Sequence, residues 1–293
     1  MSEKGFTLIE LSIVLVVIGL IIGGVLVGQD LVRSAETRGT ISQIEKYNTA
    51  VNTFYGKYGA LPGDMNALVA NQFGFSPRGS YCGEGDGDGI IQGMWANAAA
   101  SCSGTSPNGE EGLFWVDLTT ANGLNINMID GGFSTASATS YVTVTGTKLD
   151  LYMPQAKLGR GNYIYVWGGA SSNGNYFGIL AITAMNSICS GCYESTPSIP
   201  VRQAYDIDSK IDDGLPQYGR VQAFYIDHHG AGGSNGAWSN SAFSASMTPY
   251  TTATPASGST CFDNGGSAGA KQQYSLSYNN GTNTTCTLSI RFQ

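Results

Sequence analysis

Acidic residues alternate with glycine over one short segment, which reads EGDGDG from Glu84 to Gly89. Carboxylates at alternate positions converge on one point when the chain coils tightly, and glycine permits such a coil. The arrangement matches the first half of a calcium-binding loop. Trp95 stands where such a loop needs a bidentate glutamate, so that ligand has to come from elsewhere. The segment predicts a calcium site, with a solvated acidic turn as the alternative, and its candidate ligands are Glu84, Asp86, Asp88, Glu110 and Glu111.

A second acidic cluster reads DIDSKIDDG from Asp206 to Gly214. Lys210 stands where a metal site would need another oxygen ligand, and its charge can offset those of the neighbouring carboxylates. The residues from Asp212 to Pro216 are typical of a turn that precedes a strand. We interpret this cluster as a turn, with a metal site as the alternative.

The chain has six cysteines, an even number that suits disulfides in an oxidising compartment. One pair forms a C-x-x-C, but no second such pair and no βαβ pattern accompanies it, which favours a structural staple over a redox or zinc site. Six cysteines allow about 15 connectivities, so proximity in the chain guides the assignment. The predicted pairs are Cys82 with Cys102, Cys189 with Cys192, and Cys261 with Cys286.

Motifs for catalysis are weak, and we predict no enzyme activity. The stretch from Gly232 to Gly236 fits G-x-S-x-G literally, but it is a Gly/Ser/Asn segment without the strand and helix that a nucleophile elbow needs. The only histidines, His228 and His229, are adjacent and diverge on an extended chain.

The amino-acid composition argues against two classes of protein, nucleic-acid-binding and disordered. Charged residues make up 12% of the 293 residues, about half the usual share, and 41 glycines fill much of the gap. The net charge is −7, and only 14 residues are basic, which argues against a general nucleic-acid-binding surface. Low charge together with many aromatic residues also argues against disorder.

The N-terminal segment departs from this average. From Phe6 to Gln29 a single charged residue, Glu10, interrupts the apolar sequence, and the stretch is long enough to span a bilayer. The five residues before it are too short and too weakly basic for an ordinary secretory signal, and no cleavage site follows the apolar run. A plain membrane anchor leaves the carboxylate unexplained, because an ionised group in lipid costs at least ~2.5 kcal/mol.

The sequence GFTLIE from Gly5 to Glu10 resembles the processing site of type IV prepilins and type II secretion pseudopilins. The resemblance implies cleavage between Gly5 and Phe6 by a prepilin peptidase, and methylation of the new Phe6 amine. It further implies that the Phe6 amine of one subunit approaches the Glu10 carboxylate of another in a helical filament. In such an apolar setting the pair sets the register of the subunits.

The same resemblance implies partners and a location. The partners are copies of the chain and other pilins, the prepilin peptidase, an inner-membrane assembly platform and membrane lipid. The precursor would cross the bacterial inner membrane once with its head in the periplasm, and then enter a filament that is periplasmic or extracellular. The resemblance is compatible with three kinds of filament: a pilus, a secretion pseudopilus and a DNA-uptake filament. Some pseudopilins bind calcium in their heads, which agrees with the predicted calcium site.

A binding role for the head is the alternative to a purely structural one. A surface adhesin or carbohydrate-binding head could be displayed on the same filament. Exposed aromatic rings can stack on sugars, and Trp238 and Tyr250 are candidates for this contact.

One long helix has to connect the membrane segment to the head. Apolar residues at helical spacing predict an amphipathic continuation that ends near Gly59, because a Pro-Gly turn follows. Its buried face is predicted to comprise Ile41, Ile44, Val51, Tyr55 and Tyr58. The predicted organisation is a leader (1–5), a transmembrane or filament-core helix (6–29), an amphipathic helix (30–59) and a globular head (60–293).

The remainder of the chain alternates short apolar runs with turn residues. This pattern predicts an antiparallel sheet packed on the long helix, hence an α+β fold stapled by disulfides. A short helix is expected around Leu113–Asn122. The predicted strands are Tyr141–Val144, Lys148–Tyr152, Tyr163–Trp167, Gly178–Ala184, Val221–Ile226, Gln273–Tyr278 and Thr285–Phe292.

Overall fold

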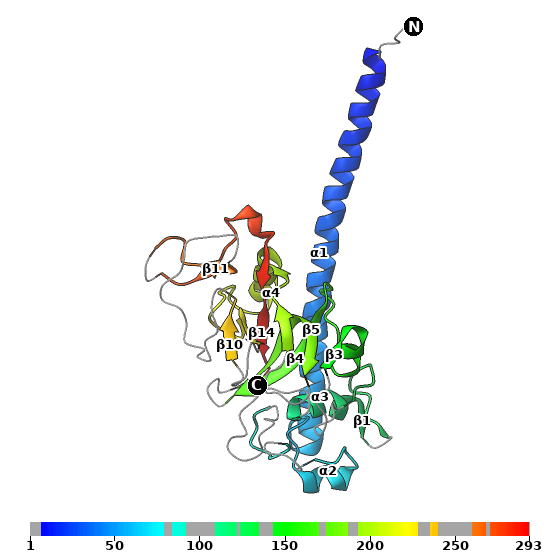
Figure 1. The fold of residues 1–293 in the computed structure, drawn as a ribbon, viewed down its shortest axis with the longest axis vertical. Coiled ribbons are helices and arrows are strands. Elements are labelled where there is room, and N and C mark those ends of the chain that lie inside the picture. Colours follow the sequence, from blue (N-terminus) through cyan, green and yellow to red (C-terminus); the bar gives the residue numbers. More distant parts are fainter. Residues whose placement is uncertain are drawn as a thin grey trace.

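The protein consists of one long helix with a head packed on its C-terminal half, while the N-terminal half projects away from the head (Figure 1). This arrangement is seen in a computed structural model. The structure describes residues 7–78, 84–91, 109–121, 124–134, 143–169, 174–186, 193–227, 235–239, 260–267 and 270–292.

The long helix α1 runs from Leu8 to Tyr58 without interruption, including the glycine-rich part of its first half. It ends where Gly59 adopts a left-handed conformation with φ 71°, and the Gly59 N–H donates to the Tyr55 carbonyl at 2.8 Å. The predicted end of the helix is therefore confirmed, and its cause is a glycine C-cap.

The face that α1 buries in the head is carried by residues spaced three and four apart. Ile44 and Val51 lie on this face as predicted, whereas Tyr55 was predicted wrongly and is 50% exposed. Its neighbour Phe54 is fully buried instead, in contact with Tyr58 and Phe75. Since neighbouring helix positions differ by about 100° in direction, a shift of one residue moves a side chain from core to solvent.

The main sheet is antiparallel and is built around one long strand, β5 (Gly174–Asn186). One edge of β5 pairs with β4 (Asn162–Gly169), and β14 (Leu288–Arg291) pairs with the same part of β5 on the other side. Further pairs join the distal part of β5 to β3 (Thr143–Thr145) and β6 (Tyr193–Thr196), and β14 to β8 (Val221–Gln222). A sheet that packs on a helix confirms the predicted α+β class.

Short elements surround this sheet. Two-stranded pairings join β1 (Thr120–Ala121) to β2 (Leu124–Asn125), β9 (Phe224–Asp227) to β10 (Asn235–Trp238), β11 (Phe262–Asp263) to β12 (Gln273–Tyr274), and β13 (Thr284–Cys286) to β7 (Ile199–Pro200). The shorter helices are α2 (Ala67–Phe73), α3 (Glu110–Thr119) and α4 (Val201–Ile211), with 3₁₀ turns η1 (Gly146–Leu151) and η2 (Asn279–Gly281).

The predicted elements were partly correct. The helix expected near Leu113 is α3, but the strand expected at Lys148–Tyr152 is wrong, because this segment forms η1. Gly146 turns the chain there with φ 62°, and only Leu149 within η1 is buried, so one side chain meets the core instead of an alternating row.

A disulfide joins Cys261 and Cys286, whose Cα atoms lie 5.0 Å apart. It connects the chain just before β11 to the end of β13, and both cysteines are fully buried. The predicted pairing is confirmed for these two residues. The other four cysteines, Cys82, Cys102, Cys189 and Cys192, lie outside the described residues.

Candidate functional site

The N-terminal half of α1 presents apolar side chains on every side. From Leu8 to Val27 the large hydrophobic residues are at least 46% exposed, and an 18-residue stretch of the helix has a mean hydropathy of 2.9. Such a surface is unstable in water, because each buried square ångström of apolar area is worth about 25 cal/mol. The exposed half of α1 therefore requires lipid or other protein chains around it.

Glu10 closes a capping box at the start of this helix. Its Oε2 accepts hydrogen bonds from the Thr7 N–H and the Thr7 hydroxyl, both at 2.8 Å, and the Glu10 N–H donates to the Thr7 hydroxyl at 3.3 Å. These bonds satisfy N–H groups that a helix start leaves without partners. The T-x-x-E spacing could have revealed this second role of Glu10 from the sequence. The predicted cleavage and methylation residues, Gly5 and Phe6, lie outside the described residues.

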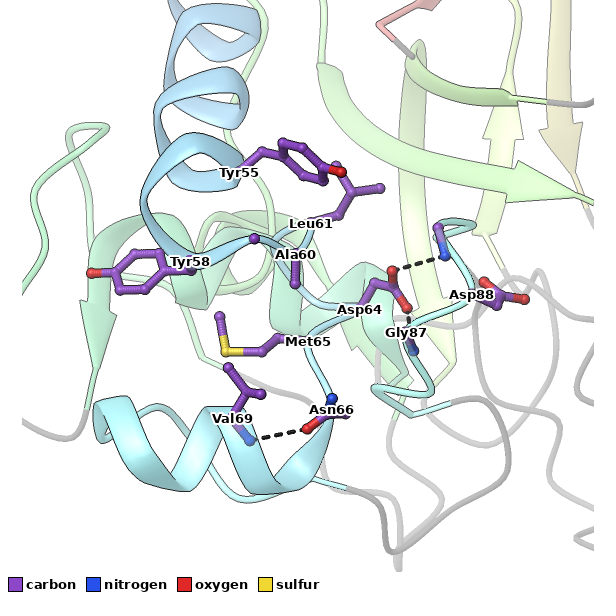
Figure 2. Close-up of a pocket in the computed structure, with 12 residues that line it drawn as sticks. Tyr55, Tyr58, Ala60, Leu61, Asp64, Met65, Asn66, Val69, Gly87 and Asp88 are labelled. Atoms are coloured by element: carbon purple, nitrogen blue, oxygen red, sulfur yellow. Dashed lines mark hydrogen bonds between the residues drawn. The ribbon is translucent and has the colours of Figure 1, made fainter.

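The acidic turn from Glu84 to Gly89 lies directly beyond the C-terminal end of α1 (Figure 2). Asp64, from the segment that follows α1, holds the turn by accepting hydrogen bonds from the N–H groups of Gly87 at 2.8 Å and Gly89 at 3.0 Å. Gly85 is required in this turn, because a Cβ there would lie 2.5 Å from the Met65 carbonyl oxygen and φ is 67°.

Three carboxylates meet at this point. Oxygens of Asp64, Asp86 and Asp88 lie within 4.8 Å of one another, with Asp64 buried and the other two exposed. Burial raises the pKa of Asp64 to about 6, an effect that the N–H groups of Gly89 and Gly87 oppose and the charges of Asp88 and Asp86 reinforce. Asp64 was not among the predicted ligands. Its position in a Leu-Pro-Gly-Asp turn after a long helix gives no sign that it reaches residues more than twenty positions later.

The two glutamates expected to complete a calcium site occupy other positions. Glu110 Oε1 accepts from the Gly85 N–H at 2.9 Å, so this buried carboxylate anchors the backbone of the turn. Glu111 Oε2 accepts from the Tyr193 hydroxyl at 3.2 Å, away from the three-carboxylate group. Glu84 belongs to the turn but is not a member of that group either.

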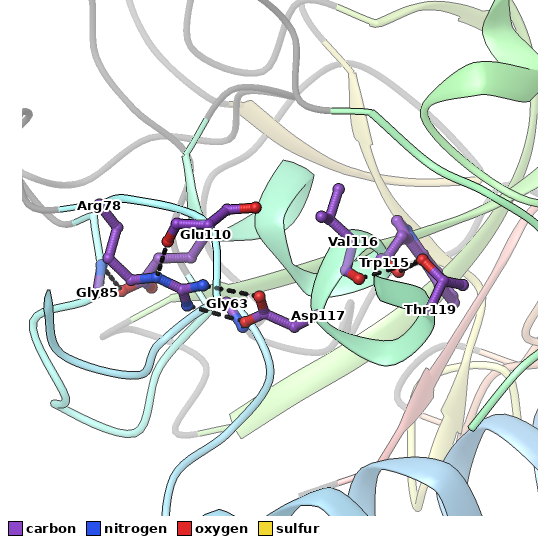
Figure 3. A network of polar contacts seen from close by, with 9 residues as sticks. Gly63, Arg78, Gly85, Glu110, Trp115, Val116, Asp117 and Thr119 are labelled. Atoms are coloured by element: carbon purple, nitrogen blue, oxygen red, sulfur yellow. Dashed lines mark hydrogen bonds and ion pairs between the residues drawn. The ribbon is translucent and has the colours of Figure 1, made fainter. Parts of the chain in front are cut away.

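A buried ion pair between Arg78 and Asp117 lies next to this turn (Figure 3). The Arg78 guanidinium donates to both Asp117 oxygens, at 2.8 and 2.7 Å, and both side chains are fully shielded from solvent. The Gly63 N–H adds a third hydrogen bond to Asp117, at 2.7 Å. Helix α3 therefore anchors the segment after α1 through Asp117, and the acidic turn through Glu110.

The second acidic cluster ends helix α4, which the sequence did not predict. Asp208 is fully buried and accepts hydrogen bonds from the Tyr274 hydroxyl at 2.8 Å and the Gly214 N–H at 3.0 Å. Gly214 has φ 74°, as the predicted turn requires. Oxygens of Asp212 and Asp213 lie within 4.8 Å of Asp208, but Asp212 accepts from the backbone N–H groups of Arg220 and Val221.

The aromatic residues proposed to stack on sugars do not form a described binding surface. Trp238 is 1% exposed and packs edge-on against Phe224, with ring centroids 5.1 Å apart, so its predicted exposure was wrong. The reason is its position on β10, where Trp238 and its neighbour Ala237 belong to the hydrophobic core. Tyr250, His228 and His229 lie outside the described residues.

Comparison with known protein families finds a match at the N-terminus of the chain. Residues 1–26 match the family model described as the prokaryotic N-terminal methylation motif, which is the signature of type IV pilins and pseudopilins. No curated protein and no solved structure matches the chain. The motif and the apolar half of α1 together fit a membrane-anchored precursor that later enters a filament.

Proposed function

We propose that this chain, which carries the type IV pilin and pseudopilin signature, is a structural subunit of a type IV pilus or a type II secretion-like pseudopilus. The observation that carries the proposal is the junction of two features: the methylation motif at residues 1–26 leads directly into a helix half that is apolar and exposed on all sides. Motif families of this kind are structural rather than enzymatic.

Lipid and protein would cover this helix in succession. Before assembly, residues 6–29 span the inner membrane and the head lies in the periplasm. After a prepilin peptidase cuts behind Gly5, the assembly platform moves the chain into a filament, where helices of neighbouring subunits replace lipid. Either environment removes the apolar side chains from water, and small residues such as Gly19 and Gly23 let helices approach closely.

Glu10 would set the register of this packing. Cleavage creates a charged amine on Phe6, and the Glu10 carboxylate of a neighbouring subunit is its natural partner among apolar side chains. The attraction is strong at low dielectric, but desolvation offsets much of it, so the main effect is to penalise every register that leaves Glu10 unpaired.

Substitution of Glu10 tests this proposal. The Glu10→Ala variant should produce no filaments while its head remains folded, because no described residue of the head covers the first turns of α1, whose large apolar side chains are exposed. Asp30→Ala removes an exposed carboxylate from the same helix outside the motif, and it should assemble normally. Normal filaments from Glu10→Ala, seen by electron microscopy of sheared cell-surface or periplasmic fractions, would refute the proposal.

We also propose that the acidic turn binds calcium, with Asp64, Asp86 and Asp88 as the carboxylate ligands. The supporting observation is that the fold brings Asp64 to the two aspartates that the sequence pattern singles out. Calcium needs six to eight oxygens, so backbone carbonyls or water would complete its shell.

Chelation should lower the melting temperature of the full chain in detergent. The Asp86→Ala variant should melt at the same temperature with and without chelator. An unchanged melting temperature of the unaltered chain after chelation would remove calcium from the account.

A further inference from the structure

A cleft of about 300 Å³ lies between the middle of α1, the end of α4 and the last strand β14. Its floor is apolar and includes Ile44, Phe177 and Ile290, each at most 5% exposed. Figure 1 shows α4 beside the middle of α1, whereas α2 lies past the C-terminal end of α1. The cleft therefore sits closer to the membrane segment than the acidic turn does.

Three cations from three separate segments surround the cleft. They are Lys210 at the end of α4, Arg220 in the loop before β8, and Arg291 on β14, all of them exposed. Glu45 is the only carboxylate among the lining residues, which together carry a net charge of about +2, and Asp212 lies just outside the lining, where it accepts from the Arg220 N–H. None of the ion pairs between described residues involves Lys210 or Arg220. Three of the 14 basic residues of a chain with a net charge of −7 therefore line one cleft.

The acidic turn is the complementary surface. Asp86, Gly87 and Asp88 are exposed, and Asp64 adds a third carboxylate behind them. One bound calcium ion would leave these three carboxylates with a net charge of about −1, and Glu84 adds a further negative charge. The turn is therefore negative with or without calcium.

Within one chain the two surfaces cannot meet, because they lie at different levels along α1. The cleft is level with Glu45 and Asn48, and the turn lies beyond Tyr58. At 1.5 Å per residue this separation is about 20 Å along the helix axis. In a filament of parallel α1 helices, a second copy displaced by about this distance brings its cleft to the turn of the first.

We propose that the basic cleft receives the acidic turn of a second copy of this chain, as a head-to-head contact that repeats along the filament. The inference rests on the proposed filament function and adds the surface that sets the axial spacing of the heads. Opposite charges across such a contact favour one register and disfavour others.

Zero-length cross-linking of native filaments tests the contact. A carbodiimide joins a lysine amine to a carboxylate only where the two touch, and filaments assembled from a mixture of ¹⁴N and ¹⁵N chains reveal links between copies. We expect a mixed-isotope link from Lys210 to Asp86 or Asp88, found in filaments and absent from detergent-solubilised monomers. Lys46 and Asp130 form an ion pair within one chain, so their link should appear in both samples and serves as the control.

Charge reversal provides a second test of the proposed contact. Lys210→Glu with Arg220→Glu should reduce filament yield at least about tenfold. Adding Glu84→Lys, a change in the acidic turn that spares the three proposed calcium ligands, should restore part of it. Lys148→Glu with Lys157→Glu changes the net charge equally at exposed sites outside the cleft, and should assemble normally.

Filaments that show the Lys46–Asp130 link but no Lys210 link, and that tolerate the cleft reversal, would overturn this contact while leaving the filament function intact. Absence of filaments from the unaltered chain would overturn the filament proposal and this contact with it.

Discussion

Individual buried charges hold the junction between the long helix and the head. Arg78 and Asp117 form two hydrogen bonds in a site that excludes solvent, and Gly63 supplies a third. A pair of this kind contributes little compared with a well-packed apolar pair, but its partners depend on each other. Removing one side chain leaves the other as an uncompensated charge in the interior.

The Asp117→Ala variant should therefore lose about 3–5 kcal/mol of unfolding free energy, because it leaves the Arg78 guanidinium buried without its partner. Denaturant unfolding of the full chain in detergent measures this loss. Lys46→Ala removes the exposed ion pair with Asp130 and should cost at most about 1 kcal/mol. Equal losses for the two variants would show that the Arg78 site is not shielded as described.

Asp208 predicts a dependence of stability on pH. Burial raises its pKa from 3.8 to about 7, and the charges of Asp213 and Asp212 add to this effect, whereas hydrogen bonds from the Tyr274 hydroxyl and the Gly214 N–H oppose it. Between these two pKa values the folded state holds a proton that the unfolded state has lost. The contribution of Asp208 to stability should therefore fall as the pH rises from about 4 to about 7, and stay constant above that range.

Melting temperatures measured from pH 5 to pH 8 test this behaviour. The Asp208→Asn variant keeps the shape of the side chain but cannot titrate, so it should lose part of the decline in stability that the unaltered chain shows toward neutral pH. The difference between the two curves isolates Asp208 from other groups with raised pKa values, such as Asp64. Parallel curves would contradict the assignment.

At the scale of elements, the register of α1 against the head depends on single positions. Phe54→Ala should cost about 3–5 kcal/mol, because this ring is fully buried among Tyr58, Phe75 and neighbouring core residues. Tyr55→Ala, one position along, removes a half-exposed ring and should cost much less. Thermal unfolding of both variants measures the contrast, and similar losses would place the helix in a different rotation about its axis.

Local signals made the long helix and the central strands predictable. Gly59 and the Pro-Gly turn after it end α1, and the alternation in Tyr163–Trp167 identifies the core of β4. The C-terminal disulfide followed from two cysteines that flank short strands. These features depend on neighbours in the sequence, which is why one sequence suffices to find them.

Features that depend on distant contacts were not predictable in the same way. Helix α4 has no side-chain N-cap at Pro200, and its aspartates suggested a turn throughout. The burial of Trp238 and the approach of Asp64 to the acidic turn are set by packing between remote segments. The sequence therefore predicted only part of the three-carboxylate group. Asp86 and Asp88 come from one local pattern, whereas Asp64 comes from a remote segment.

At the scale of the whole molecule, the low share of charged residues has one cause in the first half of α1 and another in the head. The first half of α1 is apolar and exposed, and it requires lipid or neighbouring helices. The head carries few charges, and two acidic clusters and one basic cleft concentrate several of them at separate positions. These features agree with the proposed filament, in which the helices stack and contacts between heads set the axial spacing.

The central claim is that the chain is a processed pilin-like subunit, and mass spectrometry of its N-terminal peptide tests it most directly. Protein isolated from the membrane and filament fractions of cells with a prepilin peptidase should begin at Phe6, with one methyl group on the α-amine. The apolar segment should remain attached to the head. A chain that retains Met1 in the filament fraction, or one cut after the apolar segment, would contradict the account.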